Sequence, residues 1–218
     1  MIRPKSALMV AATLCLMFVL SACNGENANV NRGPGTALVL IDLQTDYLST
    51  SGKKPIAQDQ IAPLVSAVNS LIQAARAQAF PVVYSMNLIS QFDFFHIFKH
   101  GTAALRYSPG QMIDPQVDSV AGPYFAKSSE DAFCNSEFSN HLDALDTGNL
   151  VVAGVYADKS VLATVKTAIA NGYKVTVISD AVGSSSDDAR DAALEELKTA
   201  GAKVETSAEF RAPGAMKS

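Results

Sequence analysis

The sequence has few basic residues, and they do not gather in a run. Lysine and arginine together number 17 among 218 residues, against 21 aspartates and glutamates, which gives a formal net charge of −4. Proteins that bind nucleic acid or anionic membranes through charge carry clustered lysine and arginine. We therefore expect no nucleic-acid partner. Hydrophobic residues make up 48% of the chain, which is enough for one folded domain with a sizeable core.

No apolar run is long enough to span a bilayer. The longest run covers residues 7–20 and follows Arg3 and Lys5, whereas a membrane-spanning helix needs roughly 20 apolar residues. A short basic stretch, an apolar core and small residues before a cut are typical of a secretory signal. Leu20-Ser21-Ala22-Cys23 resembles the bacterial lipoprotein box, in which the cysteine is lipidated and becomes the first mature residue. An ordinary signal peptide with an incidental Cys23 is the alternative.

This reading divides the chain into three parts. Residues 1–22 are predicted to be a lipoprotein signal peptide and residues 23–35 a lipid-anchored tether, because the latter are polar and rich in asparagine and glycine. Residues 36–218 are predicted to form one domain. Asn24 after the lipidated cysteine favours the outer membrane in a Gram-negative cell. We therefore expect an exported protein, anchored by its lipid on the periplasmic face of that membrane.

Cysteine is scarce as well. The chain has three cysteines. Cys15 would leave with the signal and Cys23 would carry the lipid, so Cys134 would remain as the one free thiol. A single thiol cannot form an internal disulfide. We expect no disulfide framework in this fold.

Short apolar runs alternate with helical periods from residue 36 onward. The runs predict strands, and the periodic segments predict helices near 61–75, 136–146, 158–171 and 187–200. Alternation of this kind predicts parallel strands joined by right-handed crossovers, with helices on both faces of the sheet. The strands are expected at Ala37–Leu43, Pro81–Met86, Tyr124–Lys127, Asn149–Gly154, Tyr173–Ser179 and Ala202–Thr206.

Three polar residues follow strands of this predicted sheet. Asp42 lies at the end of the first strand, Lys127 at the end of the third, and Ser160 after the fourth, near the start of a helix. Ligands of open parallel sheets bind beyond the C-terminal strand ends. Each residue also has an ordinary structural explanation: a buried aspartate that holds a loop, a solvated lysine, and a serine that serves the helix start.

Several motifs resemble the isochorismatase-like, or cysteine hydrolase, superfamily. They are ALVLIDLQTDY, PVVYSMN, Lys127 ahead of Ala132-Phe133, and VVAGVYADKSVLATVKTAIANGYKVTVISDAVGS. The resemblance covers roughly residues 36–206. It implies a three-layer α-β-α fold with a six-stranded parallel, Rossmann-like sheet. It also implies a hydrolase with a small-molecule substrate, no cofactor, and assembly into a homo-oligomer, since superfamily members often form dimers or tetramers.

The resemblance assigns a catalytic aspartate, lysine and cysteine to Asp42, Lys127 and position 160, where this chain has Ser160 instead of cysteine. A serine hydroxyl is far harder to ionise than a thiol, and no histidine lies within the motifs to act as its base. In the family, the peptide bond at the position of Val155–Tyr156 is often cis and helps to form an oxyanion hole. We therefore expect a cis bond there, with both residues near the substrate.

Isochorismatases proper lack the cysteine and hydrolyse a vinyl ether. The resemblance therefore favours hydrolysis of a small cyclic vinyl ether, with Asp42 as general acid and Ser160 bonding to substrate. Burial would favour the protonated acid and Lys127 the carboxylate, and the sequence leaves that balance open. The alternatives are an amidase that uses Ser160 as nucleophile and a ligand-binding lipoprotein without catalysis.

The irregular segment 87–113 is predicted to line the mouth of the site. Its aromatic residues, Phe95 among them, would enclose a ring, and Arg106 would meet a carboxylate, with Gln44 as a further substrate contact. Core or oligomer contacts are the alternative for the aromatics. His96 and His100 have the i, i+4 spacing of metal ligands. However, Asn87 stands where nicotinamidases place an aspartate ligand, so we expect no metal.

Overall fold

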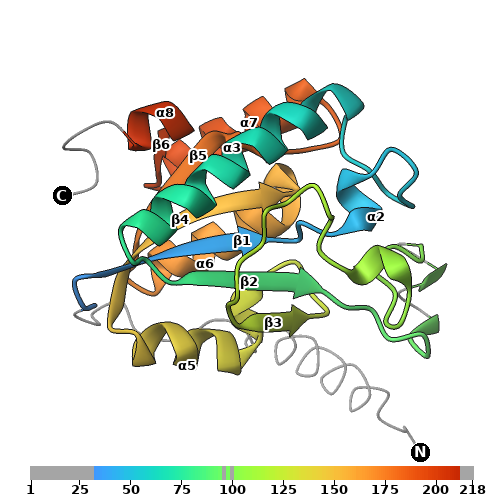
Figure 1. Ribbon diagram of the computed structural model, residues 1–218. Helices are drawn as coiled ribbons and strands as arrows, with labels where there is room; N and C mark the ends of the chain where they lie inside the picture. The colour runs from blue at the N-terminus through green and yellow to red at the C-terminus, as the bar shows by residue number, and fades with distance from the viewer. Residues whose placement is uncertain (1–31, 95–96, 99–100, 212–218) are drawn as a thin grey trace, which may run out of the picture.

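The computed structural model describes residues 32–94, 97–98 and 101–211. Its centre is a six-stranded sheet in the order β3-β2-β1-β4-β5-β6, with every neighbouring pair parallel. Figure 1 shows the central strand arrows pointing toward the side of the molecule where α2 lies. The strands are β1 (Gly35–Ile41), β2 (Val82–Asn87), β3 (Tyr124–Lys127), β4 (Thr147–Val155), β5 (Lys174–Gly183) and β6 (Lys203–Glu205).

Helices cover both faces of the sheet, as expected for strands buried on both sides. One face carries α3 (Gln58–Ala77) and α8 (Ser207–Phe210), and the other carries α5 (Ser136–Ala144), α6 (Leu162–Ala170) and α7 (Asp187–Thr199). The shorter helical segments are α2 (Thr45–Leu48), the 3-10 turns η1 (Pro109–Gln111) and η2 (Ala132–Cys134), and the π-helical turn η3 (Ala157–Val161).

The strand sequence explains why there are two cores. Successive side chains of a strand point to opposite faces of a sheet. In β1, Leu38 and Leu40 pack in the α3 core, whereas Val39 and Ile41 pack in the core under α5, α6 and α7. The continuous apolar run in the sequence is therefore split evenly between two hydrophobic clusters. This confirms the predicted three-layer α/β fold.

The direction of the strand order reverses at β1. The chain moves from β1 outward to β2 and β3, and then returns to β4 on the other side of β1. The crossovers leave β1 and β4 in opposite directions, which opens a crevice beyond their C-terminal ends. Asp42 follows β1 and has a φ of 53°. In β4, Gly154 has a φ of 138°, and a side chain there would place its Cβ 2.0 Å from the carbonyl oxygen of Ile41.

The structure corrects the expectation of a free thiol at Cys134. Cys134 is disulfide-bonded. The predicted free thiol at this position is therefore wrong. The predicted signal peptide, lipid-bearing Cys23 and most of the tether also lie outside the described residues. Within those residues, no helix has both the length and the apolar character needed to cross a membrane.

Candidate active site

One of the three polar residues that the sequence singles out, Lys127, bonds to the other two. The Lys127 ammonium donates hydrogen bonds to Asp42 Oδ2 at 2.7 Å and to Ser160 Oγ at 3.1 Å. Its third donor goes to the carbonyl oxygen of Ser129 at 3.2 Å. Only 3% of Asp42, 4% of Lys127 and 7% of Ser160 is exposed. The structure thus brings an acid, an amine and a hydroxyl into one buried cluster.

Three strands position this cluster. Asp42 directly follows β1, Lys127 ends β3, and Ser160 lies in η3, a short distance beyond β4. In the sheet, β2 separates β3 from β1, and Asn87 of β2 is in register with Lys127. A long lysine side chain is therefore required to reach Asp42 across the intervening strand. A shorter basic or polar residue at position 127 would not make this contact.

The two oxygens of the Asp42 carboxylate differ in their hydrogen bonds. Oδ2 accepts from Lys127, whereas Oδ1 is buried without a hydrogen bond to any residue that the structure describes. A buried, unsatisfied carboxylate oxygen is costly. Asp42 also lines a cavity, so a ligand in that cavity can supply the missing donor, or receive a proton from this oxygen.

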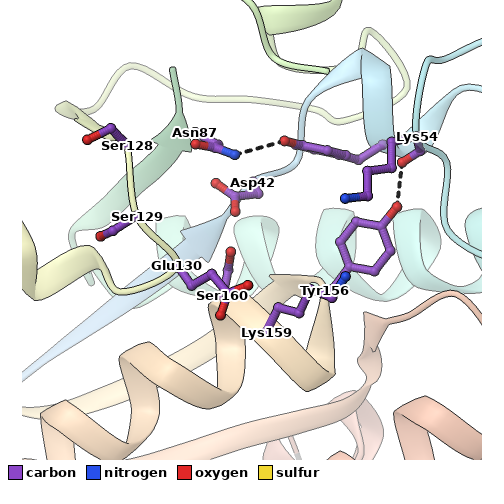
Figure 2. Close-up of a pocket in the computed structure, with 10 residues that line it drawn as sticks. Asp42, Lys54, Asn87, Ser128, Ser129, Glu130, Tyr156, Lys159 and Ser160 are labelled. Carbon is purple, nitrogen blue, oxygen red and sulfur yellow. Dashed lines mark hydrogen bonds between the residues drawn. The ribbon is translucent and has the colours of Figure 1, made fainter. Parts of the chain in front are cut away.

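The cavity has a volume of about 280 Å³, which suits a small molecule. Figure 2 shows how its side chains lie: Lys54, Tyr156 and Lys159 gather on one side of Asp42, and Ser128 and Ser129 lie on the other. The residues that line it are Asp42, Tyr47, Lys54, Asn87, Ser128, Ser129, Glu130, Tyr156, Lys159 and Ser160.

Two tyrosines form an aromatic wall of this cavity. The rings of Tyr47 and Tyr156 meet edge to face, with centroids 5.8 Å apart. The Tyr47 hydroxyl accepts a hydrogen bond from Asn87 Nδ2 at 3.0 Å, and the Tyr156 hydroxyl donates to the carbonyl oxygen of Lys54. Burial, and then the negative charge of Asp42, raise the pKa of Tyr47 above its usual value. Burial, and then Asp158, raise the pKa of Tyr156 to about 12. Both rings therefore stay neutral at physiological pH.

The peptide bond between Val155 and Tyr156 is cis, which confirms that prediction. The two residues differ in their place at the site. Tyr156 lines the cavity, whereas Val155 is fully buried at the end of β4 and is not among the lining residues. Sequence reasoning missed Tyr47, Lys54 and Lys159 as cavity residues. Tyr47 lies in the first motif and Lys159 precedes Ser160, so closeness to the motifs was the available signal.

Two other predicted substrate contacts lie elsewhere. The Gln44 amide is fully buried and bonds only to main chain: Nε2 donates to the carbonyls of Asn87 and Gln111, and Oε1 accepts from the amide of Asn87. Gln44 therefore fastens loops behind the site and is not a substrate contact. Arg106 is exposed and is not among the lining residues. Phe95 lies outside the described residues.

The aromatic segment also differs from its prediction. Phe92, Phe94, Phe98 and Tyr107 are each at least 76% exposed, so they neither line the cavity nor join the core. Asp131, four residues after Lys127, has a structural role. It accepts from the Phe133 amide and the Thr167 hydroxyl, and burial raises its pKa.

At the ligand position considered for a metal from the sequence, the cavity presents Asn87. Asn87 contributes a neutral amide, whose nitrogen already donates to Tyr47. Among the residues the structure describes, no group of three or more histidines, cysteines and acids could hold a metal ion. His96 and His100 lie outside those residues.

The sequence matches the isochorismatase domain over residues 36–209, which covers the sheet, the cavity and the buried cluster. The chain belongs to the isochorismatase family. The protein is therefore an isochorismatase-family hydrolase. A comparison with curated proteins finds no match.

Solved structures with the same fold include several hydrolases. The isochorismatase-like hydrolase of Alkaliphilus metalliredigens aligns with a TM-score of 0.75 at 18% identity, over 81% of this chain and 97% of the other. The pyrazinamidase/nicotinamidase of Streptococcus mutans aligns at 0.71 and 22%, over 78% and 99%. The N-carbamoylsarcosine amidase of Thermoplasma acidophilum aligns at 0.70 and 22%, over 81% and 99%. At these identities the likeness establishes the fold.

Proposed function

We propose that this isochorismatase-family hydrolase cleaves a small cyclic vinyl ether, with Asp42 as general acid, Lys127 as its charge partner and Ser160 as a substrate contact. The observation that carries the proposal is the divided role of the Asp42 carboxyl group. One oxygen is held by Lys127, and the other is buried without a partner among the described residues, beside a cavity of small-molecule size. A carboxyl group held in this way has one position for a transferable proton.

The chemistry follows from that arrangement. In the substrate complex, Asp42 carries a proton on Oδ1 and transfers it to the terminal carbon of the vinyl group, and the ether carbon becomes an oxocarbenium ion. The Lys127 ammonium, 2.7 Å from Oδ2, stabilises the carboxylate that this step creates. Water then adds to the cation and returns a proton to Asp42. The resulting hemiketal breaks into a carbonyl compound and an alcohol.

Ser160 has a different part in this mechanism than the cysteine that the family's motif places there. Its oxygen accepts from the Lys127 ammonium, and an ammonium has no lone pair with which to remove the hydroxyl proton. Ser160 therefore has its own proton available to donate to a substrate oxygen. A nucleophile would instead need a base, and Asp42 would have to serve.

The test is Asp42→Asn, assayed on a panel of vinyl ethers and amides. The amide keeps the size of the carboxyl group but cannot act as the acid, and general acid catalysis contributes about 10²–10⁴-fold to a rate. We expect kcat to fall by about 10³-fold, with circular dichroism used to establish that the variant, which also loses the buried ion pair with Lys127, is folded at the assay temperature. The exposed Asp118 provides the control Asp118→Asn, which should retain full activity. Turnover by Asp42→Asn within tenfold of the wild type would rule out the proposed acid.

An amidase that uses Ser160 is the second candidate. It is supported by the position of Ser160 Oγ at the cavity, 3.1 Å from Lys127 Nζ, and by a fold shared with proteins named as amidases. Mass spectrometry of the protein quenched during amide turnover distinguishes the two. An acyl adduct on Ser160 would support the amidase. Binding without turnover of any compound in the panel would favour a non-catalytic ligand-binding lipoprotein.

The cellular setting is also a proposal. We infer that residues 1–22 are a lipoprotein signal peptide, that Cys23 carries the lipid, and that residues 36–218 form the hydrolase domain on the periplasmic face of the outer membrane. The support is the order of Arg3 and Lys5, the apolar run and the Leu-Ser-Ala-Cys box. In this setting the partners are a small-molecule substrate, the membrane through the lipid, and further copies of the chain, with no nucleic acid.

A further inference from the structure

The first residue that the structure describes, Arg32, is held in place by three different groups. Its guanidinium carbon lies 4.0 Å from the centre of the Tyr173 ring, and its Nη1 forms an ion pair with Asp143. Its Nε donates to the carbonyl oxygen of Asn171 at 3.0 Å. Tyr173 is itself only 4% exposed, and its hydroxyl donates to the same Asp143 carboxylate. A cation–π contact, an ion pair and a hydrogen bond therefore fix this point of the chain to the domain.

The residues that follow Arg32 are wedged against the start of β4. A side chain at Gly33 would place its Cβ 2.0 Å from Asp146 Oδ1, and one at Gly148 would place its Cβ 2.0 Å from the carbonyl oxygen of Gly33. The amide of Gly35 donates to the carbonyl oxygen of Asp146 at 3.0 Å. These close approaches leave no room for the segment to shift, so the chain enters the domain at one defined place.

This entry point and the cavity lie at opposite ends of the parallel strands. Gly35 begins β1 and pairs with Thr147, the first residue of β4, whereas Asp42 follows the last residue of β1 and lines the cavity. Because a strand rises about 3.3 Å per residue, β1 separates the two ends by about 20 Å. Figure 1 shows the same separation, with β1 beginning on the left and its arrow pointing toward α2 on the right.

The predicted tether is short compared with that separation. Residues 24–31 lie between Cys23 and Arg32. A polar chain of this length has a root-mean-square span of about 15 Å, and full extension would give about 30 Å. If the cavity faced the bilayer, the entry point would lie more than about 20 Å from the lipid headgroups. The tether would then have to extend well beyond its mean span, which costs conformational entropy.

We propose that the face of the domain at the N-terminal strand ends is its membrane-facing surface, and that the cavity opens toward the aqueous compartment. This inference rests on the lipid anchor given under the proposed function, and it adds that the substrate enters from water. The partner of this surface is the bilayer that holds the Cys23 lipid. The opposite orientation would instead bring the exposed aromatic residues beyond β2, such as Phe92 and Phe94, against the bilayer.

The test uses the absence of tryptophan from the chain, since a single introduced tryptophan then reports on one face. Lys174→Trp places the reporter at the entry end, because Lys174 is exposed and begins β5, in register with Asn149 near the start of β4. Phe92→Trp is the matched reporter at the cavity end, where Phe92 is 79% exposed. The lipoprotein is reconstituted in phosphatidylcholine vesicles that carry a nitroxide on the lipid headgroup, and the quenching of tryptophan fluorescence is measured.

We expect quenching to be at least about threefold stronger for Lys174→Trp than for Phe92→Trp, because the mean tether span keeps the entry end near the headgroups. Insertion of about twenty glycine and serine residues after Asn31 raises that span to about 30 Å, so the difference should fall below about twofold. Equal quenching of the two reporters, or stronger quenching of Phe92→Trp, would overturn the proposal. A difference unaffected by the insertion would overturn the role given to the tether.

Vesicle flotation separates a failure of this proposal from a failure of the anchor. A protein that stays in solution, as expected for Cys23→Ser, would remove the anchor and the membrane-facing surface together. A protein that floats with the vesicles but shows the reverse order of quenching would leave the anchor in place and remove only the orientation. Neither result affects the test of Asp42→Asn, which measures turnover.

Discussion

Lys127→Met is expected to destabilise the fold severely. The Lys127 side chain is 1% exposed and that of Asp42 is 4% exposed, so the substitution leaves a carboxylate buried without its counter-charge. Breaking a buried ion pair from one side costs about 3–5 kcal/mol. Methionine retains most of the aliphatic stem of lysine, so lost packing adds little. The hydrogen bonds to Ser129 and Ser160 are lost at the same time.

The measurement is the free energy of unfolding in urea at pH 7, followed by circular dichroism. The double variant Asp42→Asn with Lys127→Met removes both charges, and it should recover most of the stability lost in the single variant. Lys166→Met is the matched control. Lys166 and Glu196 also form an ion pair, but their side chains are 47% and 51% exposed, so its loss should cost at most about 1 kcal/mol.

Two results would refute this reasoning. A cost for Lys127→Met within about 1 kcal/mol of the Lys166→Met control would mean that the ion pair is screened. A double variant no more stable than Lys127→Met would mean that the lysine stabilises the fold through contacts other than the charge of Asp42. The double-mutant cycle separates these cases, because it isolates the interaction between the two side chains.

Three further outcomes are expected. Gly154→Ala should destabilise the fold by more than about 3 kcal/mol in urea unfolding. The new Cβ would lie 2.0 Å from the Ile41 carbonyl oxygen, and residue 154 has a φ of 138°. A loss of stability below about 1 kcal/mol would contradict that geometry. Tyr156→Phe should flatten the fall in melting temperature between pH 10 and about pH 12. The pKa of this phenol in the folded protein is raised from 10.0 to about 12, so its stabilising effect is lost as pH rises through that window. A pH profile of the melting temperature that is the same in the variant as in the wild type would disprove this role of Tyr156. Cys23→Ser should move the protein from the membrane to the soluble fraction of cells, and retention at the membrane would exclude the lipid anchor.

The order of elements was readable from the sequence because it depends on local chemistry. A strand buried on both faces must be apolar at nearly every position, and β1 is such a run. A helix packed on one side must repeat its apolar residues at helical spacing, as α3 does with Ile61, Leu64, Val65 and Val68. Parallel strands joined by crossovers then place Asp42, Lys127 and Ser160 at one edge of the sheet.

The contents of the cavity depended on contacts between distant segments. Gln44, Arg106 and the aromatics of 87–113 were expected to face substrate because they lie near the motifs in sequence. The structure instead ties Gln44 to main chain of Asn87 and Gln111 and leaves Arg106 exposed. Proximity along the chain says nothing about the direction of a loop side chain, which is set by the partner that satisfies its hydrogen bonds.

The sequence by itself determined the layers, the parallel sheet and the three residues at its edge, because hydrophobic period and strand order are properties of the chain alone. Only the tertiary structure decided that Lys127 reaches across β2 to Asp42, that Asp42 Oδ1 has no partner among the described residues, and that Lys54 and Lys159 converge on one cavity. These are distances between segments far apart in sequence. They are set by packing and by the need to satisfy buried charges, neither of which a linear pattern contains.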